Sequence, residues 1–207
     1  MSGKNKTMKI GIFGGSFDPV HLGHIGLAKD ALEQAGLDKV ILIPAKLQPF
    51  KLDKKLTSGE DRVAMLELEI ANLEGFEISR FELDQESISY TYLTLRAMQE
   101  KYGDNARLYF ITGTDAFLKI DLWKNAEELL TSYSFIIGTR PGYKQQELEE
   151  FIKKIKDEYG TDVINIKNTQ IDVSSTEIRD ILEKNMSAEG LISPDVERYI
   201  KDNGLYR

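Results

Sequence analysis

Along the chain, short runs of β-branched and aromatic residues alternate with longer stretches in which apolar residues recur every three or four positions. The first pattern is typical of buried strands and the second of amphipathic helices. Strands are predicted at 8–15, 39–44, 76–83, 107–112, 134–139 and 162–166. Helices are predicted at 21–36, within 57–73, at 91–103 and 145–160, and at two places that open near 174–179 and 193–200.

Several residues mark where these helices begin and end. Gly36 and Gly103 stand directly after helical patterns, where a glycine in the left-handed conformation commonly ends a helix. Thr57 and Glu60 have the spacing of a capping box at the start of the helix within 57–73.

Strand and helix alternate almost throughout. This order predicts an α/β fold with one doubly wound, mostly parallel Rossmann-like sheet, helices on both faces and right-handed crossovers. We expect residues 1–7 to form a flexible tail and 8–207 a single domain, with a small helical part at about 168–207. Ligands of such sheets bind beyond the carboxyl ends of the strands, where the strand order reverses. We therefore expect the ligand-binding site to be formed by the loops 14–21, 44–57 and 113–123.

Composition restricts the partners. The 207 residues include 27 Lys and Arg against 34 Asp and Glu, a net charge of −7, which argues against a nucleic-acid-binding surface. No apolar run approaches the roughly 18 residues needed to cross a bilayer, so no membrane partner is expected. The absence of cysteine excludes disulfides and thiolate zinc sites and fits a cytoplasmic protein. The sequence leaves open whether the chain forms a homo-oligomer.

The stretch GGSFDPVHLGH, which begins at Gly14, contains both histidines of the chain. Gly14 and Gly15 let the backbone turn sharply and approach a ligand closely. The main-chain amides at the start of the following helix carry positive partial charge. His21 and His24, three residues apart, share one face of that helix, and Gly23 leaves space beside them. Together these features predict a phosphate-binding site in which the imidazoles are additional donors.

This stretch also has other interpretations. Two histidines at this spacing could bind a metal, but carboxylates would have to complete the ligand set; they could also be incidental surface residues. The familiar phosphate motifs G-x-x-x-x-G-K-[ST] and G-x-G-x-x-G are both absent. Asp18 could bind magnesium or simply hold the turn.

GGSFDPVHLGH resembles the signature of the nucleotidyltransferase superfamily with the HxGH motif. Class I aminoacyl-tRNA synthetases share the histidine pair, but they carry extra domains for which this acidic chain has no room. From Met8 to about Arg207 the chain is similar to bacterial nicotinate mononucleotide adenylyltransferases. The supporting stretches are SYTYLTL (89–95), GTDAFLKIDLW (113–123), TRPG (139–142) and VSSTEIR (173–179). The related phosphopantetheine adenylyltransferases are shorter and have threonine in place of His21.

The resemblance implies a nucleotidyltransferase that joins the adenylyl group of ATP to nicotinate mononucleotide, giving deamido-NAD and pyrophosphate in NAD biosynthesis. Attack is direct and in line, without a covalent enzyme intermediate, because the phosphate of the acceptor is itself the nucleophile. Mg²⁺ is expected to arrive with ATP, and no protein metal ligand is assigned. Two alternatives stay open: the same chemistry on nicotinamide mononucleotide or another phosphorylated acceptor, and a nucleotide-binding regulator with weakened catalysis.

The resemblance also implies roles for individual residues. The catalytic residues would be His21, His24 and Arg179. ATP would contact Gly14, Gly15, Ser16, Phe17, His21, His24, Lys51, Ser174, Ser175 and Arg179. Nicotinate mononucleotide would contact Thr91, Asp115, Trp123 and Arg140.

Some of these assignments have simpler explanations. Trp123 could be a core residue, and Ser174 and Arg179 could be an ordinary helix cap followed by an exposed arginine. Arg140 could anchor its loop. The chain departs from the family pattern at Phe50, where histidine is common, which leaves open how strongly ATP binds.

Overall fold

The computed structural model describes residues 7–46, 56–86, 88–139, 142–168 and 173–207. Apart from Thr7, the tail predicted at 1–7 lies outside these ranges. Phe50, Lys51 and Arg140 also lie outside them. Within the described ranges, no helix is both long enough and apolar enough to span a membrane.

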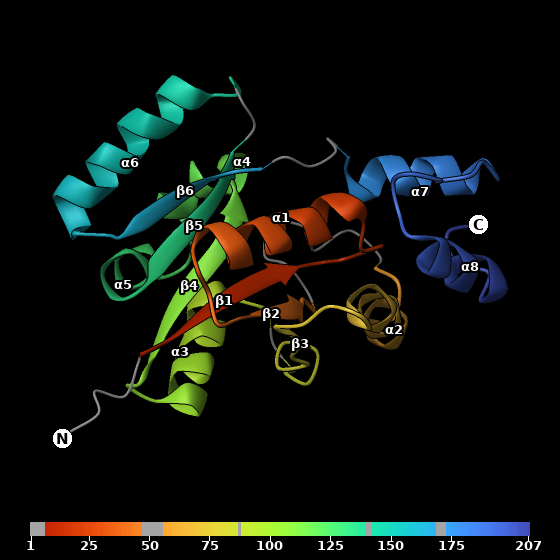
Figure 1. The fold of residues 1–207 in the computed structure, drawn as a ribbon, viewed down its shortest axis with the longest axis horizontal. Helices are drawn as coiled ribbons and strands as arrows, with labels where there is room; N and C mark the ends of the chain where they lie inside the picture. The colour runs from red at the N-terminus through yellow and green to blue at the C-terminus, as the bar shows by residue number, and fades with distance from the viewer. Residues whose placement is uncertain (1–6, 47–55, 87, 140–141, 169–172) are drawn as a thin grey trace.

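The fold is built on a six-stranded parallel sheet in the order β3-β2-β1-β4-β5-β6 (Figure 1). The strands are β1 (Met8–Gly15), β2 (Lys39–Pro44), β3 (Phe76–Ile78), β4 (Ala106–Gly113), β5 (Ser134–Thr139) and β6 (Val163–Lys167). β1 is central, and its Ile12 pairs with Ile41 of β2 on one side and Phe110 of β4 on the other. The strand order reverses between β1 and β4, which is the expected ligand-binding position of a doubly wound sheet. The predicted fold class is confirmed.

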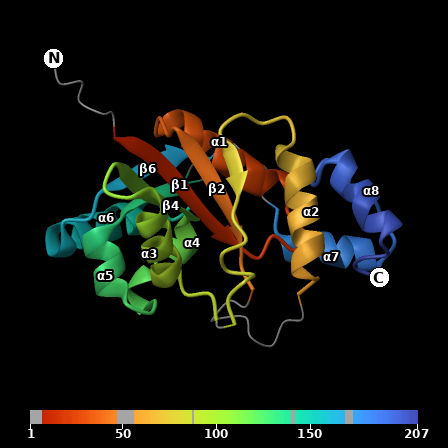
Figure 2. The ribbon, with the colours of Figure 1, turned by 90° about the horizontal axis from the view of Figure 1, so that it is seen from below.

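Helices cover both faces of the sheet. They are α1 (Leu22–Gln34), α2 (Gly59–Ile70), α3 (Thr91–Tyr102), α4 (Thr114–Phe117), the 3₁₀ helix η1 (Ile120–Leu122), α5 (Ala126–Ser132), α6 (Gln145–Tyr159), α7 (Ser175–Glu183) and α8 (Pro194–Asp202). One face packs against α1, α2, α7 and α8, and the other against α3 to α6. In Figure 2, α2, α7 and α8 stand together at one end of the molecule.

Two apolar cores follow from this arrangement. Along β1, Ile10 and Ile12 point toward α3 to α6, whereas Phe13 points toward α1. The middle of the strand is buried on both faces, as its continuous apolar run predicts. Burying each such side chain stabilises the fold by roughly 1.5–3 kcal/mol.

The predicted helix ends after α1 and α3 are confirmed. Gly36 has φ of 60° and Gly103 has φ of 68°, values that side chains with a Cβ rarely adopt. The structure also contains helices that the sequence pattern did not predict. The predicted loop 113–123 holds α4 and η1, and α5 follows it. These elements have at most seven residues, too few for a clear helical period.

The strand predicted at 76–83 is wrong beyond Ile78, because β3 ends there. The chain turns instead, and the amide of Asp84 donates to the carbonyl of Arg80 over 3.0 Å. This turn places Glu82 in the interior, where its carboxylate accepts a 2.6 Å hydrogen bond from the hydroxyl of Thr94. The residue pattern of 79–83 therefore resembles that of a strand, although the chain turns there.

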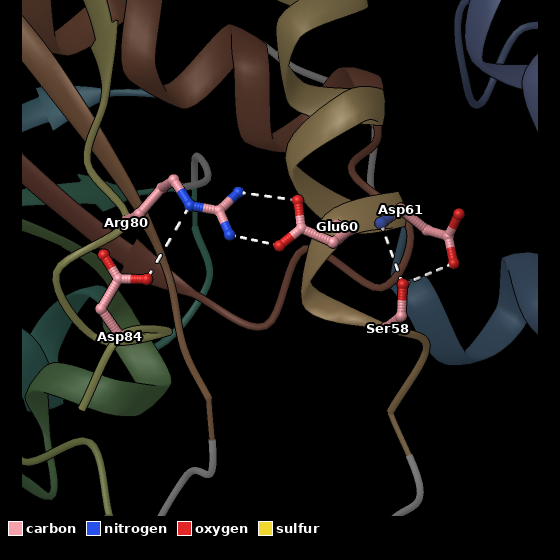
Figure 3. A network of polar contacts seen from close by, with 5 residues as sticks. All are labelled: Ser58, Glu60, Asp61, Arg80 and Asp84. Carbon is pink, nitrogen blue, oxygen red and sulfur yellow. Dashed lines mark hydrogen bonds and ion pairs between the residues drawn. The ribbon is translucent and has the colours of Figure 1, made fainter. Parts of the chain in front are cut away.

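The capping box predicted from Thr57 and Glu60 is also wrong. Ser58 is the N-cap of α2, and its hydroxyl accepts a 3.1 Å hydrogen bond from the amide of Asp61 (Figure 3). Glu60 points away and pairs with Arg80. The backbone of Thr57 is engaged elsewhere, since its carbonyl accepts a hydrogen bond from the side chain of Arg62.

Candidate active site

A pocket of about 170 Å³ opens at the carboxyl end of the sheet, beside the position where the strand order reverses. The start of α1 forms one wall, and the ends of β4 and β5 form the other. The lining residues are His21, Gly23, His24, Leu27, Gly113, Thr114, Asp115, Gly138, Tyr143, Asn168 and Val173. The pocket thus brings together three of the residues singled out from the sequence: His21, His24 and Asp115.

The loop after β1 holds the histidines through aromatic packing. Phe17 has φ of 48° and a fully buried ring that lies edge-on to His24, with 5.0 Å between ring centroids. A Cβ added to Gly15 would lie 3.0 Å from the Phe17 ring, tighter than ordinary van der Waals contact, so glycine favours this close approach. The side chain of Phe17, expected at the ATP, therefore supports His24 from beneath.

The two histidines cap one another at the start of α1. Nδ1 of His21 accepts from the amide of His24, and Nδ1 of His24 accepts from the amide of His21, each over 3.3 Å. An amide can only donate, so both Nδ1 atoms are unprotonated. In the neutral rings the proton then lies on Nε2, which leaves each imidazole with one N–H donor. The rings are stacked, with centroids 3.6 Å apart.

Burial keeps His21 neutral. It lowers the pKa of the imidazole from 6.5 to about 4, and the nearby charge of Glu177 offsets only part of this effect. His21 is 5% exposed. At neutral pH this ring is therefore uncharged, and it can donate one hydrogen bond from Nε2–H.

The buried His21 predicts a pH dependence of stability. Below pH 6.5 the unfolded chain takes up a proton that the folded chain resists until about pH 4, so stability falls as the pH falls through this window. A pKa difference of this size corresponds to a loss of roughly 3 kcal/mol. Urea unfolding between pH 7 and 4 measures it. His21→Asn is the matched control, because asparagine keeps an N-cap acceptor without a titrating ring. Parallel stability curves for the two proteins would contradict the prediction.

The start of α7 anchors the turn at Asp18 and Pro19, which are joined by a cis peptide bond. Arg179 donates to the carbonyl of Asp18 over 2.6 Å, and the hydroxyl of Ser175 donates to the carbonyl of Pro19 over 2.9 Å. Ser174 caps α7 in a capping box with Glu177. Ser175 and Arg179, two of the side chains expected to bind phosphates, thus hold the loop that carries the histidines.

Asp18 holds the same turn from within. Its carboxylate accepts hydrogen bonds from the hydroxyl of Tyr206 over 2.6 Å and from the amide of Thr57 over 3.4 Å. These contacts fit the turn-holding role, one of the two roles that the sequence leaves open for Asp18. Among the described residues, no group of three or more His, Asp or Glu side chains is arranged to bind a metal.

Asp115 lies across the pocket from the histidines. Its carboxylate accepts hydrogen bonds from Lys144 Nζ over 2.8 Å and from the hydroxyl of Tyr143 over 3.0 Å. The hydrogen bond from Lys144 lowers the pKa of Asp115. An ionised acceptor therefore stands opposite two neutral donors, which suits a ligand with both hydroxyl and phosphate groups.

Comparisons with known proteins agree on one family. Residues 12–181 match the model of cytidylyltransferase-like proteins. A "probable nicotinate-nucleotide adenylyltransferase" of Thermoanaerobacter sp. is 37% identical over 98% of this chain and 96% of its own length. The Moorella thermoacetica protein of the same description is 40% identical over 96% of this chain and 92% of its own. The chain belongs to the nicotinate-nucleotide adenylyltransferase family. Plasmodium falciparum nicotinic acid mononucleotide adenylyltransferase complexed with NaAD has a similar fold, with a TM-score of 0.77, 25% identity and coverage of 96% and 97%.

Two residues expected at the acceptor in this family lie on the other face of the sheet. Trp123 packs edge-on against Phe110 of β4, with 5.8 Å between ring centroids. The Phe110 ring also approaches Gly14, within 3.7 Å of where a Cβ would stand. Thr91 is the first residue of α3, where Tyr90 makes no side-chain capping bond within the described chain. Neither Thr91 nor Trp123 lines the histidine pocket.

Several residues that shape the site were not predicted from the sequence. Tyr143 and Asn168 follow β5 and β6, so the rule that ligands bind after the strands could have found them. Arg62 and Tyr206 support the loop from distant parts of the chain. No local pattern marks these two, because their partners are 46 and 188 residues away in the sequence.

Proposed function

We propose that this member of the family transfers the adenylyl group of ATP to nicotinate mononucleotide. A phosphate oxygen of the mononucleotide attacks the α-phosphorus of ATP. The bond from that phosphorus to the oxygen leading to the β-phosphate breaks, and the oxygen leaves with the electron pair as part of pyrophosphate. The product is deamido-NAD. The observation that carries the proposal is the histidine pair, which presents two Nε2–H donors at the edge where the strand order reverses.

His21 and His24 would hold the phosphates of ATP and stabilise the charge that develops as pyrophosphate departs. Neutral donors already in place need no reorganisation during the reaction, and the low pKa of His21 keeps that ring in this state. The amides of the loop at Gly14, Gly15 and Ser16 and those at the start of α7 would add main-chain donors. Direct phosphate contacts by Ser174, Ser175 and Arg179 stay a prediction. The observed contacts are the bonds of Ser175 and Arg179 to the turn and the capping of α7 by Ser174.

The acceptor would lie on the Trp123 side of β1, with its pyridine ring against the indole. The carboxylate of nicotinate suits the start of α3 at Thr91, since a helix N-terminus favours negative charge. Asp115 would bind a ribose hydroxyl. These placements make the acid a better acceptor than the amide.

Mg²⁺ would enter with ATP and neutralise the charge of the leaving pyrophosphate. The described residues include no cluster that would bind it independently of the nucleotide. Lys51, outside the described residues, is a predicted cation at the triphosphate. The absence of cysteine supports a cytoplasmic location.

Pyrophosphate release from ATP and Mg²⁺ tests this proposal with a panel of acceptors. We expect nicotinate mononucleotide to exceed nicotinamide mononucleotide in kcat/KM by about tenfold or more, because only the acid places a charge at the start of α3. Phosphopantetheine is the control acceptor, since it has no pyridine ring. A preference for nicotinamide mononucleotide would refute the assignment of the acceptor, but the transfer of an adenylyl group would still be supported. Release with none of the acceptors would favour the nucleotide-binding regulator.

A further inference from the structure

The carboxylate of Asp18 is buried beneath the loop that leads to the histidines. Asp18 is 2% exposed, and a buried carboxylate is stable only when its oxygens accept hydrogen bonds. Of its two hydrogen bonds within the described chain, the shorter comes from the hydroxyl of Tyr206, over 2.6 Å. A hydroxyl bonded to an ionised carboxylate makes one of the stronger hydrogen bonds in proteins.

Tyr206 reaches this position because the chain folds back after α8. The amide of Leu205 donates to the carbonyl of Ile200 over 3.0 Å, and Tyr206 has φ of 57°. The ring packs against the apolar core on the α1 face. Burial and the adjacent carboxylate raise the pKa of Tyr206, so its hydroxyl stays protonated and donates.

Only two residues separate Asp18 from His21, and neither is free to absorb a displacement. The carbonyl of Pro19 is held by Ser175, and Val20 is fully buried. His21 is itself the N-cap of α1 and shares its capping bonds with His24. A shift of the Asp18 carboxylate therefore reaches both imidazoles.

We propose that Tyr206 is a positioning residue for nucleotidyl transfer, which fixes the imidazoles of His21 and His24 by holding the Asp18 carboxylate. The proposal rests on the proposed function in one respect, namely that the histidines contact the phosphates of ATP. Misplacement of a reacting group by about 1 Å can lower a rate by about 100-fold. Losing the Tyr206 hydroxyl is therefore expected to act mainly on kcat.

Tyr206→Phe tests the proposal, because it removes one hydroxyl and keeps the buried ring. Tyr199→Phe is the matched control. The hydroxyl of Tyr199 donates to the carboxylate of Asp61 over 2.9 Å, so this variant also loses one tyrosine-to-aspartate bond. The other described partner of that carboxylate is Ser58 at the start of α2, not the loop that leads to the histidines. Both variants are assayed for pyrophosphate release from ATP, Mg²⁺ and nicotinate mononucleotide, well below their thermal unfolding midpoints.

We expect Tyr206→Phe to lower kcat about 10- to 100-fold with KM for nicotinate mononucleotide within about twofold. Tyr199→Phe should keep kcat within about twofold. Its unfolding midpoint should fall less than that of Tyr206→Phe, because Asp61 is only partly buried and water can replace the lost donor there. Equal kcat values for both variants would overturn the proposal. The proposal would also be overturned if the activity of Tyr206→Phe fell only in proportion to its fraction of folded protein.

A binding measurement separates this proposal from the proposed function. If the unmodified chain binds α,β-methylene-ATP but releases no pyrophosphate, the proposed function fails. The affinities of the three proteins for that analogue then decide the role of Tyr206. Weaker binding in Tyr206→Phe alone would support the positioning role, and equal affinities would overturn it. If the unmodified chain does not bind the analogue, both proposals are wrong.

Discussion

His24→Ala is expected to lower turnover by about 100-fold or more while the chain stays folded. The variant removes the Nε2–H donor and leaves His21 and the loop amides to stabilise the departing charge. It also removes the acceptor for the amide of His21 and the ring that packs on Phe17. Loss of the capping bond costs about 1 kcal/mol, small enough for a stable domain to remain folded. Steady-state pyrophosphate release, together with circular dichroism, measures both effects.

His24→Asn separates the donor from the cap. An asparagine oxygen can replace Nδ1 as the acceptor for the His21 amide, but it has no nitrogen at the position of Nε2. The stability of this variant should be closer to that of the unmodified chain, with turnover as low as in His24→Ala. Near-normal turnover in either variant would refute the assignment of His24 as a phosphate donor.

Arg62→Met is expected to lower the free energy of unfolding by about 3–5 kcal/mol. Arg62 is 2% exposed, and its guanidinium donates to the carbonyls of Ser16 over 2.7 Å and Thr57 over 3.1 Å. It is also the positive charge near the buried carboxylates of Asp18 and Glu82. Methionine fills a similar volume without replacing the charge or the donors. Urea unfolding at pH 7 gives the difference.

Arg80→Met is the control for this experiment. Arg80 pairs with the carboxylates of Glu60 and Asp84, but these pairs lie at the surface, where water replaces the lost contact (Figure 3). This variant should unfold close to the unmodified chain. If Arg62→Met is as stable as Arg80→Met, the buried charge does not hold the loop and the electrostatic explanation is wrong.

The fold was predictable because its signals are local. The central strands β1, β2, β4 and β5 carry continuous apolar runs, and α1 and α3 end at glycines that adopt positive φ. The errors occurred where tertiary contacts override a local pattern. The segment after Ile78 has a residue pattern like that of a strand. It nevertheless turns away from the sheet, and Glu82 is buried there in a hydrogen bond with Thr94.

The position of the histidine pair was predictable for the same reason. GGSFDPVHLGH places both histidines at the start of one helix, whereas the roles that the resemblance implies for them stay predictions. The capping geometry that defines their protonation depends on atoms within the same stretch, but only coordinates show which nitrogen accepts. The support from Arg62 and Tyr206 depends on how α2 and the segment after α8 pack against the loop. That packing is a property of the whole fold.

Because tryptophan and histidine are rare in this chain, they can serve as separate spectroscopic reporters for the two faces of the sheet near the reversal of strand order. Trp123 is its only tryptophan and stands against Phe110, so fluorescence emission monitors the α3 face without any label. His21 and His24 are its only imidazoles, so two sets of ring resonances in a nuclear magnetic resonance spectrum monitor the pocket beside α1. Following both signals in one titration would reveal the order in which nucleotide and acceptor bind.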